Sequence, residues 1–471
     1  MSYIELGSSL KFPTFCPNAH AITKQLVFEN PEIQNALKFV NNPSWAIRQM
    51  EPFVKHYEID NTTQQYVVPI GFKNQLFGYC GGCPHRCPVA DIRSLGERPA
   101  ERRDWTTNII LRPSQERAVD AINSTIALGG TGILQMPTGC GKTVTGFLVS
   151  QMARQNTLFV TYTKDLANQT ADSYFDFFGH EAGFIGDGKC KLDSHFTVAI
   201  IDTIAKRKLY DMISEKFGMI IVDEVHRIPT KKSLPLLNNT TCKYKVGLTA
   251  TLNRSDGTEE MIKSSFGGVV YRVSMEEAMA EGSLVPLYTE TLETNYEPNQ
   301  QHYHSKRAIS LLTEEASLNR RRNELIAGCI DIKIAQGRSS ILVLNSLAQC
   351  NLLYEMLKDC PGINAAIFTG SQSKKERRDI VADARKGIVN ALLTVQLAGI
   401  GLDIPRADHL LMDRKISDPL SVEQIVGRVV RACPSIGKTG AEVTDVYDIL
   451  CEPFRRQSEK RASVYHKFRA R

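Results

Sequence analysis

The chain has 471 residues, which at roughly 150 residues per domain indicates about three domains or two large ones. Apolar residues make up 42% and charged residues 23% of the sequence, a balance that excludes a disordered chain and a fibrous one. No run of about 18 uncharged apolar residues appears, and the first residues lack the basic start and apolar stretch of a signal peptide. We therefore expect a globular, cytoplasmic protein that does not enter a membrane.

Charges are nearly balanced along most of the chain. Lys and Arg number 57 and Asp and Glu 51, a net charge of +6, so bulk charge alone says little about a polyanionic partner. Residues 452–471 differ, with seven basic residues against two acidic ones. Such a tail can lie on phosphates or form a solvated helix face, and both interpretations stay open. The twelve cysteines are expected to be mostly reduced core residues.

Short apolar, β-branched runs alternate with amphipathic stretches after residue 105, the pattern of parallel sheets wound by helices. Residues 97–104 are dense in charge and contain a proline, which is typical of a linker. We expect an N-terminal domain of residues 1–104 and two α/β lobes of residues 105–285 and 286–471. The predicted strands are GILQM, TLFVTY, TVAIID, MIIVDE and YKVGLTA, then SSILVL, NAAIFTG, NALLTV, HLLMD and AEVTDVYDIL.

A glycine-bearing turn follows the first of these strands, in GILQMPTGCGKTVTGFL. Such a loop directs backbone N–H groups and a helix N-terminus toward one point, which suits the phosphates of a nucleotide. Lys142 would neutralise the β and γ phosphates, and Thr143 would bind Mg²⁺. Met136 stands where the strict pattern requires glycine, so an ordinary strand-to-helix turn is the alternative. The residues predicted to line the nucleotide are Thr138, Gly139, Cys140, Gly141, Lys142 and Thr143.

Two carboxylates follow another apolar strand, in MIIVDEVH. At the C-terminal edge of a sheet, Asp223 could hold Mg²⁺ through water while Glu224 polarises the attacking water. An acidic cap on a buried strand is the alternative. His226 is placed to sense the nucleotide and relay to residues 249–251, although a lone histidine here can simply be a satisfied polar residue.

PTGCGKT and DEVH together resemble the two nucleotide motifs of superfamily 2 helicases and translocases. The resemblance extends over about residues 108–452 and implies two RecA-like lobes with ATP between them. LRPSQ resembles the adenine-reading element of this superfamily, which implies base contacts from Arg112 and Gln115. GLTAT resembles the motif that links hydrolysis to strand movement.

Other matching motifs imply contacts with nucleic acid. VTYTKDLANQ resembles the segment that grips the nucleic-acid backbone, with Thr163 and Lys164 as candidate contacts, and Thr394 in the second lobe is a further candidate. TGSQSKKERRD, LAGIGLDIP and QIVGRVVR match the rest of the set. In LAGIGLDIP, Gly401 and Asp403 would complete the second wall of the nucleotide cleft.

QIVGRVVR also has a direct physical interpretation. Gln424, Arg428 and Arg431 recur at the three- and four-residue spacing of one helix face. An arginine from another lobe can stabilise charge on the transferring phosphoryl group, so Arg428 and Arg431 are the expected arginine fingers. A basic surface helix is the alternative.

GLTATLNRSDG is similar to the stretch found in the excision-repair helicase of the eukaryotic transcription factor and in phage branch-migrating helicases. Their Arg-acid-Asp trio is here Arg254, Ser255 and Asp256, so the middle acid is missing, and a plain turn salt bridge is the alternative. Residues 28–42 and YVVPIGF look like the accessory domain of the same group, which helps to hold duplex or branched DNA, although Ile70 replaces its arginine. A passive structural cap is the alternative.

Three cysteines cluster in CGGCPHRCP. Cys80, Cys83 and Cys87 have spacing compatible with tetrahedral Zn²⁺, with His85, Cys16 or His20 as the fourth ligand. An iron–sulfur cluster and unliganded thiols remain open.

The resemblance implies an ATP- and Mg²⁺-dependent DNA helicase that moves branch points at forks and four-way junctions in replication, recombination or repair. If the protein is viral, it would work in the host cytosol. A duplex translocase or remodeller that does not separate strands is one alternative. An ATP-gated clamp on structured nucleic acid is another, but it predicts a defective hydrolytic set, whereas Lys142, Glu224 and Arg428 are present. The sequence does not reveal whether the protein has a protein partner.

Overall fold

The computed structural model divides the chain into two compact units, Met1–Met136 with Gly141–Val273 and Pro137–Cys140 with Ser274–Arg471. The division into three domains at residues 104 and 285 stays a prediction. The structure describes residues 4–6, 9–13, 16, 19–29, 53–55, 58–62, 65–70, 76, 89–97, 111–127, 130–227, 234–252, 259–303, 308–395 and 404–469.

The N-terminal part of the first unit contains a small, mainly antiparallel sheet in the order β5-β6-β2-β1-β7. Its core joins Leu10 and Phe12 to Val68 and to Ile22 of a short helix. Ile70 is also buried in this core, which accounts for an apolar residue at that position. The elements are β1 (Ile4–Leu6), β2 (Ser9–Pro13), α1 (Ala19–Lys24), β5 (Glu58–Asp60), β6 (Gln65–Pro69) and β7 (Val89–Asp91), with β3 (Val27–Glu29) and β4 (Phe53–Lys55) as a separate pair.

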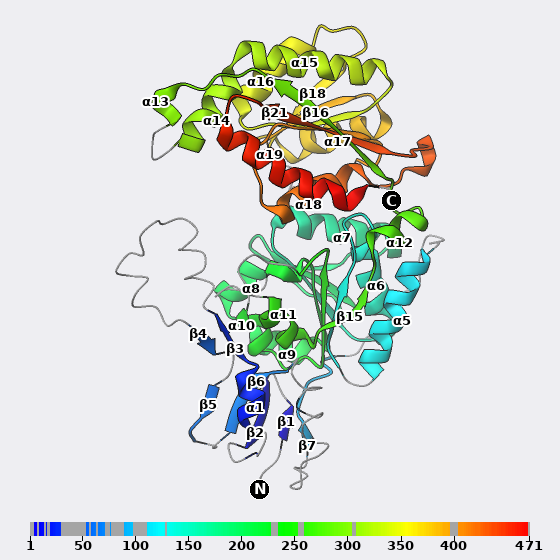
Figure 1. Ribbon diagram of the computed structural model, residues 1–471. Coiled ribbons are helices and arrows are strands. Elements are labelled where there is room, and N and C mark those ends of the chain that lie inside the picture. Colours follow the sequence, from blue (N-terminus) through cyan, green and yellow to red (C-terminus); the bar gives the residue numbers. More distant parts are fainter. Residues whose placement is uncertain are drawn as a thin grey trace. The chain divides into compact units, whose positions relative to one another are not determined.

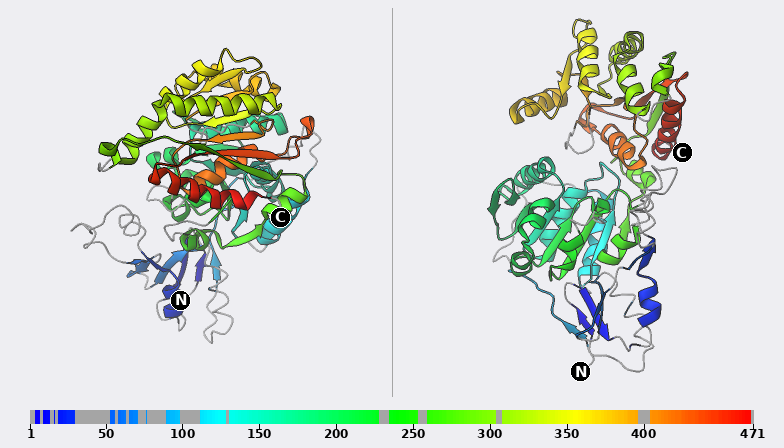
Figure 2. Two further views of the ribbon diagram at one scale, coloured as in Figure 1. Left: turned by 45° about the horizontal axis from the view of Figure 1, so that its top comes forward. Right: turned by 90° about the vertical axis from the view of Figure 1, so that its left-hand side faces the viewer.

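The large sheet of the first unit has eight strands in the order β11-β10-β12-β9-β13-β14-β8-β15. All of its pairings are parallel except that of β10 with β11. Figures 1 and 2 show helices on both of its faces. The strands are β8 (Gly132–Gln135), β9 (Thr157–Thr161), β10 (Gly183–Gly186), β11 (Lys189–Lys191), β12 (Phe196–Ile200), β13 (Met219–Val222), β14 (Tyr244–Thr249) and β15 (Val269–Arg272). The helices are α5 (Pro113–Ala127), α6 (Lys142–Ala153), α7 (Lys164–Phe178), α8 (Ile201–Arg207), α9 (Tyr210–Lys216), α10 (Leu234–Asn238) and α11 (Glu259–Phe266).

A short segment ties the N-terminal sheet to this larger one. The Ser94 backbone N–H donates to Thr241 O at 2.7 Å, and the Lys243 N–H donates to Ser94 O at 2.8 Å, which makes an isolated parallel bridge. Residues 89–97 therefore reach the end of the large sheet where β13 and β14 begin.

The second unit has a six-stranded sheet in the order β16-β21-β20-β17-β19-β18, with every pairing parallel. In Figure 1, α15 and α16 lie on one side of this sheet, and α18 and α19 lie on the other. The strands are β16 (Leu287–Thr294), β17 (Ser340–Val343), β18 (Ala365–Phe368), β19 (Ala391–Thr394), β20 (His409–Met412) and β21 (Ala441–Asp448). The helices are α12 (Met275–Ala280), α13 (Gln300–Tyr303), α14 (Ala308–Leu318), α15 (Arg320–Ala335), α16 (Leu347–Leu357), α17 (Lys374–Lys386), α18 (Pro419–Val429) and α19 (Glu452–Tyr465).

The predicted fold class, α/β with two RecA-like parallel-sheet lobes, is confirmed. All ten predicted strands form, whereas β10, β11, β15 and β16 were not predicted. β16 is an edge strand with mostly polar side chains, half of them exposed, so it lacks the continuous apolar run of a buried parallel strand. Within the described residues, no helix is long and apolar enough to cross a membrane.

The basic C-terminal tail forms α19 and the turn after it. Arg461 is fully buried and binds Asp445 through two nitrogens, each 2.7 Å from a carboxylate oxygen. Lys467 pairs with Glu423 at 3.1 Å. Both basic side chains are therefore paired with carboxylates of the second unit.

Candidate nucleotide site

The sheet order of the first unit brings three chain segments to one edge. β14 lies between β13 and β8, and all three strands are parallel, so the residues that follow them meet at the same C-terminal edge. The phosphate loop follows β8, the Asp223–Glu224 pair follows β13, and Thr249 ends β14. The Met136 N–H donates to Thr249 O at 2.9 Å, which fixes the start of the loop beside β14.

The phosphate loop depends on glycines in the left-handed region, with φ of 98° at Gly139 and 77° at Gly141. A Cβ at Gly141 would lie 2.4 Å from Nε2 of Gln115. In this part of the chain, no side chain caps the N-terminus of α6, so the backbone donors of its first turn remain suited to an anion. Of the other predicted lining residues, Thr138 and Thr143 are half-buried and Cys140 is buried.

Lys142 extends from the first turn of α6 toward the DEVH segment. Its Nζ donates to Met136 O at 3.3 Å and lies 3.9 Å from Oε1 of Glu224. The side chain is buried, so its cation is held at the base of the loop where a phosphate would lie.

Asp223 and Glu224 are adjacent carboxylates, and the Glu224 N–H donates to Oδ1 of Asp223 at 3.0 Å. Burial raises the pKa of Asp223 above its ordinary value, the neighbouring Glu224 charge raises it further, and Lys142 opposes both. Glu224 has a φ of 50°, a conformation that costs a non-glycine residue free energy and is common at functional sites.

These residues fit a divalent cation. Two neighbouring carboxylates disfavour each other's ionisation, and a cation would relieve that repulsion. Asp223 and Thr143 would supply the hard oxygen ligands that Mg²⁺ prefers. When bound, Mg²⁺ would neutralise charge on the nucleotide phosphates.

His226 connects the DEVH segment to β14. Its Nδ1 lies 3.0 Å from Oγ1 of Thr249 and 3.3 Å from Oε2 of Glu224, and the ring is buried. The Thr249 hydroxyl donates to Thr251 O at 2.7 Å, so Nδ1 must supply the proton of the His226–Thr249 bond. These contacts join Glu224 to Thr249 through His226, and a relay role for His226 remains a proposal.

The predicted adenine-reading residues lie at the start of α5. Gln115 is buried, and its Oε1 accepts from the Arg112 N–H at 3.0 Å. Its Nε2 points toward Gly141. The element thus contacts the phosphate loop, and the base contacts of Arg112 and Gln115 remain a proposal.

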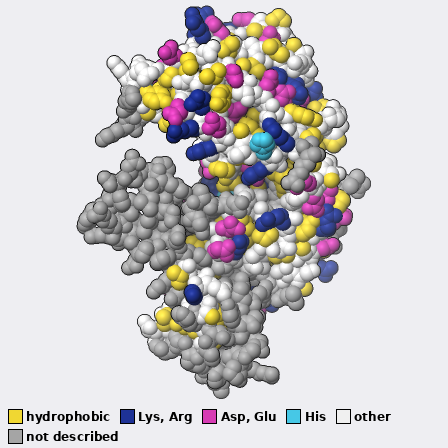
Figure 3. Space-filling view, viewed as in Figure 1, with side chains coloured by type: hydrophobic (Ala, Val, Ile, Leu, Met, Phe, Trp, Pro, Cys, Tyr) yellow, Lys and Arg dark blue, Asp and Glu magenta, His cyan; other side chains and the backbone are white. Residues whose placement is uncertain are grey.

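The predicted nucleic-acid contacts have structural partners of their own. Thr163 caps α7 by accepting from the Leu166 N–H at 3.3 Å, and Lys164 pairs with Asp187 at 2.5 Å. Thr394 is buried at the end of β19. On the visible face of the second unit in Figure 3, basic and acidic side chains are interspersed. A role in binding nucleic acid is a proposal for all three residues.

In the second unit, Gln424 and Arg428 lie on α18, and both are half-buried. The expectation that Arg431 shares their helix is corrected, because α18 ends at Val429 and Arg431 forms an isolated antiparallel bridge with Leu284. After the helix the backbone pairs with residues 283–285, where the Val285 N–H donates to Val430 O at 2.8 Å, and the Val429 carbonyl accepts from Nζ of Lys438 at 2.5 Å. Asp418 caps the other end by accepting from the Ser421 N–H at 2.9 Å.

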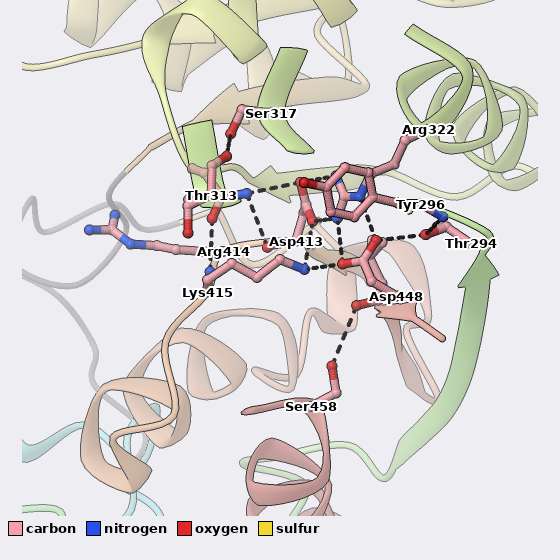
Figure 4. A network of polar contacts seen from close by, with 12 residues as sticks. Thr294, Tyr296, Thr313, Ser317, Arg322, Asp413, Arg414, Lys415, Asp448 and Ser458 are labelled. Carbon is pink, nitrogen blue, oxygen red and sulfur yellow. Dashed lines mark hydrogen bonds and ion pairs between the residues drawn. The ribbon is translucent and has the colours of Figure 1, made fainter. Parts of the chain in front are cut away.

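Sequence reasoning missed a buried network of charges at the C-terminal edge of this sheet, shown in Figure 4. Arg322 of α15 bonds to Asp413 after β20 and to Asp448 at the end of β21. Nζ of Lys415 lies 2.6 Å from Oδ2 of Asp448. All four side chains are at most 2% exposed. The two cations balance the two carboxylates, and the network fixes the segment that leads from β20 into α18.

Several predicted residues lie outside the described residues. They are Arg254 and Asp256, Gly401 and Asp403, and the cysteine cluster Cys80, Cys83 and Cys87. Across the part of the chain that the structure describes, no group of three or more His, Cys, Asp or Glu side chains is arranged to hold a metal ion.

The fold and the loop, carboxylate and histidine geometry define a class, the nucleoside-triphosphate-dependent motors with tandem RecA-like lobes. The family model described as Type III restriction enzyme, res subunit, matches residues 108–254, and that of the Helicase conserved C-terminal domain matches residues 321–433. Together they match more than half of the chain. The chain belongs to helicase superfamily 2, whose helicase domains imply ATP-dependent activity with Mg²⁺.

Three relatives share a similar degree of identity with the chain. Protein L396 of Acanthamoeba polyphaga mimivirus, which carries the name of an ATP-dependent RNA helicase, is 26% identical, covering 81% of this chain and 72% of its own length. Probable helicase D10 of Escherichia phage T5 is 25% identical, and the match covers 80% of this chain and 81% of D10. The DNA 3'-5' translocase XPB2 of Sulfurisphaera tokodaii is 25% identical, and the match covers 64% of this chain and 74% of XPB2. The resemblance to phage and XPB-type helicases is confirmed.

A solved fragment assigned to an HsdR subunit of a type I restriction enzyme from Vibrio vulnificus has a similar fold. Its TM-score is 0.55 at 19% identity, and the match covers 83% of this chain and 74% of that one. This likeness concerns the fold alone.

Proposed function

We propose that the protein is an ATP-driven DNA helicase that unwinds or branch-migrates forked and four-way DNA junctions. The observation that carries the motor part of this proposal is the meeting of the phosphate loop, the two carboxylates and Thr249 at one sheet edge, with Lys142 Nζ 3.9 Å from Glu224. In this proposal Lys142 binds the β and γ phosphates, Asp223 and Thr143 hold Mg²⁺, and Glu224 orients the attacking water.

The arginines of the second unit complete the proposed chemistry. Arg428 and Arg431 would stabilise charge on the transferring phosphoryl group, and Gln424 would help to hold the nucleotide. Hydrolysis would then change the affinity between the lobes and drive steps along a strand. The bond of His226 to Thr249 supports a route from Glu224 to the strand-moving motif.

DNA is the favoured polymer for two reasons. The DEVH and TAT forms differ from the DEAD and SAT of DEAD-box RNA helicases, and the relative from Sulfurisphaera tokodaii is named as a DNA translocase. The mimivirus relative is named as an RNA helicase, so RNA must be a substrate in the test.

The test compares ATP hydrolysis and strand separation on single-stranded DNA, blunt duplex, forked duplex, a synthetic four-way junction and matched RNA. We expect the highest hydrolysis and strand exchange on the fork and the junction, with Lys142→Ala as the inactive control. Hydrolysis on blunt duplex without strand separation would instead favour a duplex translocase or remodeller. Stimulation by RNA alone would contradict the proposal. Tight binding with almost no turnover would identify a clamp.

A further inference from the structure

α18 carries Gln424 and Arg428, and its C-terminal end is joined to another chain segment by a single side chain. Nζ of Lys438 donates to Val429 O at 2.5 Å, to Ala407 O at 2.6 Å and to Pro405 O at 2.9 Å. An ammonium group has three donors, and these three carbonyls use all of them.

The three carbonyls come from two places that matter for the proposed chemistry. Val429 is the last residue of α18, where helices leave carbonyls without an intrahelical partner and where a cation is favoured by the helix dipole. Pro405 and Ala407 lie in the turn directly after the GIGLD segment, whose Gly401 and Asp403 are predicted to face the nucleotide. Lys438 therefore joins the two nucleotide motifs of the second unit through their backbones.

The burial of Lys438 and its neighbouring charges affect the pKa of its ammonium group. The side chain is half-buried, and burial lowers the pKa of Lys438 to about 8, which Asp408 and Cys433 partly oppose and Arg431 reinforces. Its ammonium group donates to three backbone carbonyls. Loss of the ammonium group would leave those carbonyls without their donor, which is unfavourable for partly buried acceptors.

We propose that Lys438 is a positioning residue for ATP hydrolysis, which locks the turn at residues 404–407 to the C-terminal end of α18 and so fixes where Arg428 points. This inference rests on the proposed role of Arg428. It predicts that removal of the ammonium group lowers the turnover number and leaves nucleotide affinity nearly unchanged, because Lys438 acts through Arg428 and does not touch the nucleotide.

The experiment measures kcat, KM for ATP and nucleotide affinity in Lys438→Met, Lys438→Arg, Arg428→Ala and the Arg428→Ala/Lys438→Met double variant. Lys358→Met is the matched control, because Lys358 lies in the same unit and makes an exposed ion pair with Glu355. We expect kcat of Lys438→Met to fall about ten-fold or more with affinity within about two-fold, and Lys438→Arg, which keeps the charge, to be intermediate. In the Arg428→Ala background, Lys438→Met should have little further effect.

Each other outcome has a definite meaning. Unchanged kcat in Lys438→Met, or full additivity with Arg428→Ala, would overturn the role of Lys438. A parallel loss of kcat, affinity and thermal stability would show a purely structural lysine and would also overturn it. If Lys438→Met does not fold, the same cycle with Lys438→Arg decides. Normal kcat in Arg428→Ala would reject the proposed role of Arg428, a result that is separate from the Lys438 comparison.

Discussion

Nδ1 of His226 donates to Oγ1 of Thr249 across 3.0 Å in a buried site. His226 lies in the segment after β13, and Thr249 is the last residue of the neighbouring parallel strand β14. The same ring nitrogen is 3.3 Å from Glu224, so a change at that carboxylate when nucleotide binds or is hydrolysed would alter the bond to Thr249.

Removal of the hydrogen bond between His226 and Thr249 should reduce the stimulation of ATP hydrolysis by nucleic acid without preventing ATP binding. We expect His226→Ala to reduce the stimulation of ATP hydrolysis by nucleic acid about five-fold or more, with KM for ATP almost unchanged. Thr249→Val, which removes the hydroxyl, should behave alike. The exposed His180 provides the control variant His180→Ala. Full stimulation in both His226→Ala and Thr249→Val would argue against a relay.

The phosphate loop can be tested with two glycines of similar backbone conformation. Gly141 has a φ of 77° and Gly188 a φ of 80°, but a Cβ at Gly141 would meet Gln115 at 2.4 Å whereas one at Gly188 would meet nothing within 4 Å. Both Gly→Ala variants should lose about 1 kcal/mol of unfolding free energy from backbone strain. Only Gly141→Ala should also lose nucleotide affinity, measured with a fluorescent ATP analogue. Equal affinities in the two variants would contradict this description of the loop.

Arg428 should matter for chemistry more than for binding. If it stabilises charge on the transferring phosphoryl group, Arg428→Ala should lower kcat by about 10³ while nucleotide affinity changes little. Arg456→Ala is a suitable control, because Arg456 is 71% exposed and pairs within α19 with Glu452. Single-turnover hydrolysis and equilibrium binding measure the two quantities separately, and a loss confined to affinity would exclude the arginine-finger role.

The buried network of the second unit should make its stability depend on Arg322. Burial raises the pKa of Asp413, but the charges of Arg322 and Lys415 outweigh it and hold the pKa well below its usual range. In the wild type, this contribution is present above the unfolded pKa of about 3.9 and is lost as the pH falls through the lower folded value. Arg322→Met leaves the carboxylates short of a cation and should cost about 3–5 kcal/mol at pH 7.

The pH dependence of that cost identifies its cause. Without Arg322, the buried carboxyls can take up protons at higher pH, so the stability difference from wild type should shrink between pH 7 and pH 4. Urea unfolding at both values measures it. Arg320→Met, on the same helix but 84% exposed, should cost little at either pH. A cost for Arg322→Met that is independent of pH would point to lost packing instead of lost charge.

Sequence alone predicts those parts of the site whose residues lie close together along the chain, and it misses contacts between residues far apart in sequence. The phosphate loop is a strand, a turn and a helix within one stretch, and its glycines, Lys142 and Thr143 mark it directly. By contrast, Arg322 contacts Asp413 and Asp448 at separations of 91 and 126 residues, and nothing in the local pattern marks those pairs. Lys438 resembles any polar loop lysine until the fold brings three carbonyls around it.

The sequence by itself determined the superfamily, the two parallel sheets and the residues of the nucleotide motifs, because buried parallel strands and phosphate loops have strong local signatures. Tertiary structure alone decided that β14 lies between β13 and β8, and so that His226 meets Thr249. It also decided where α18 ends and which side chains hold it. Strand order and long-range hydrogen bonds depend on how the whole chain packs, which no local pattern encodes.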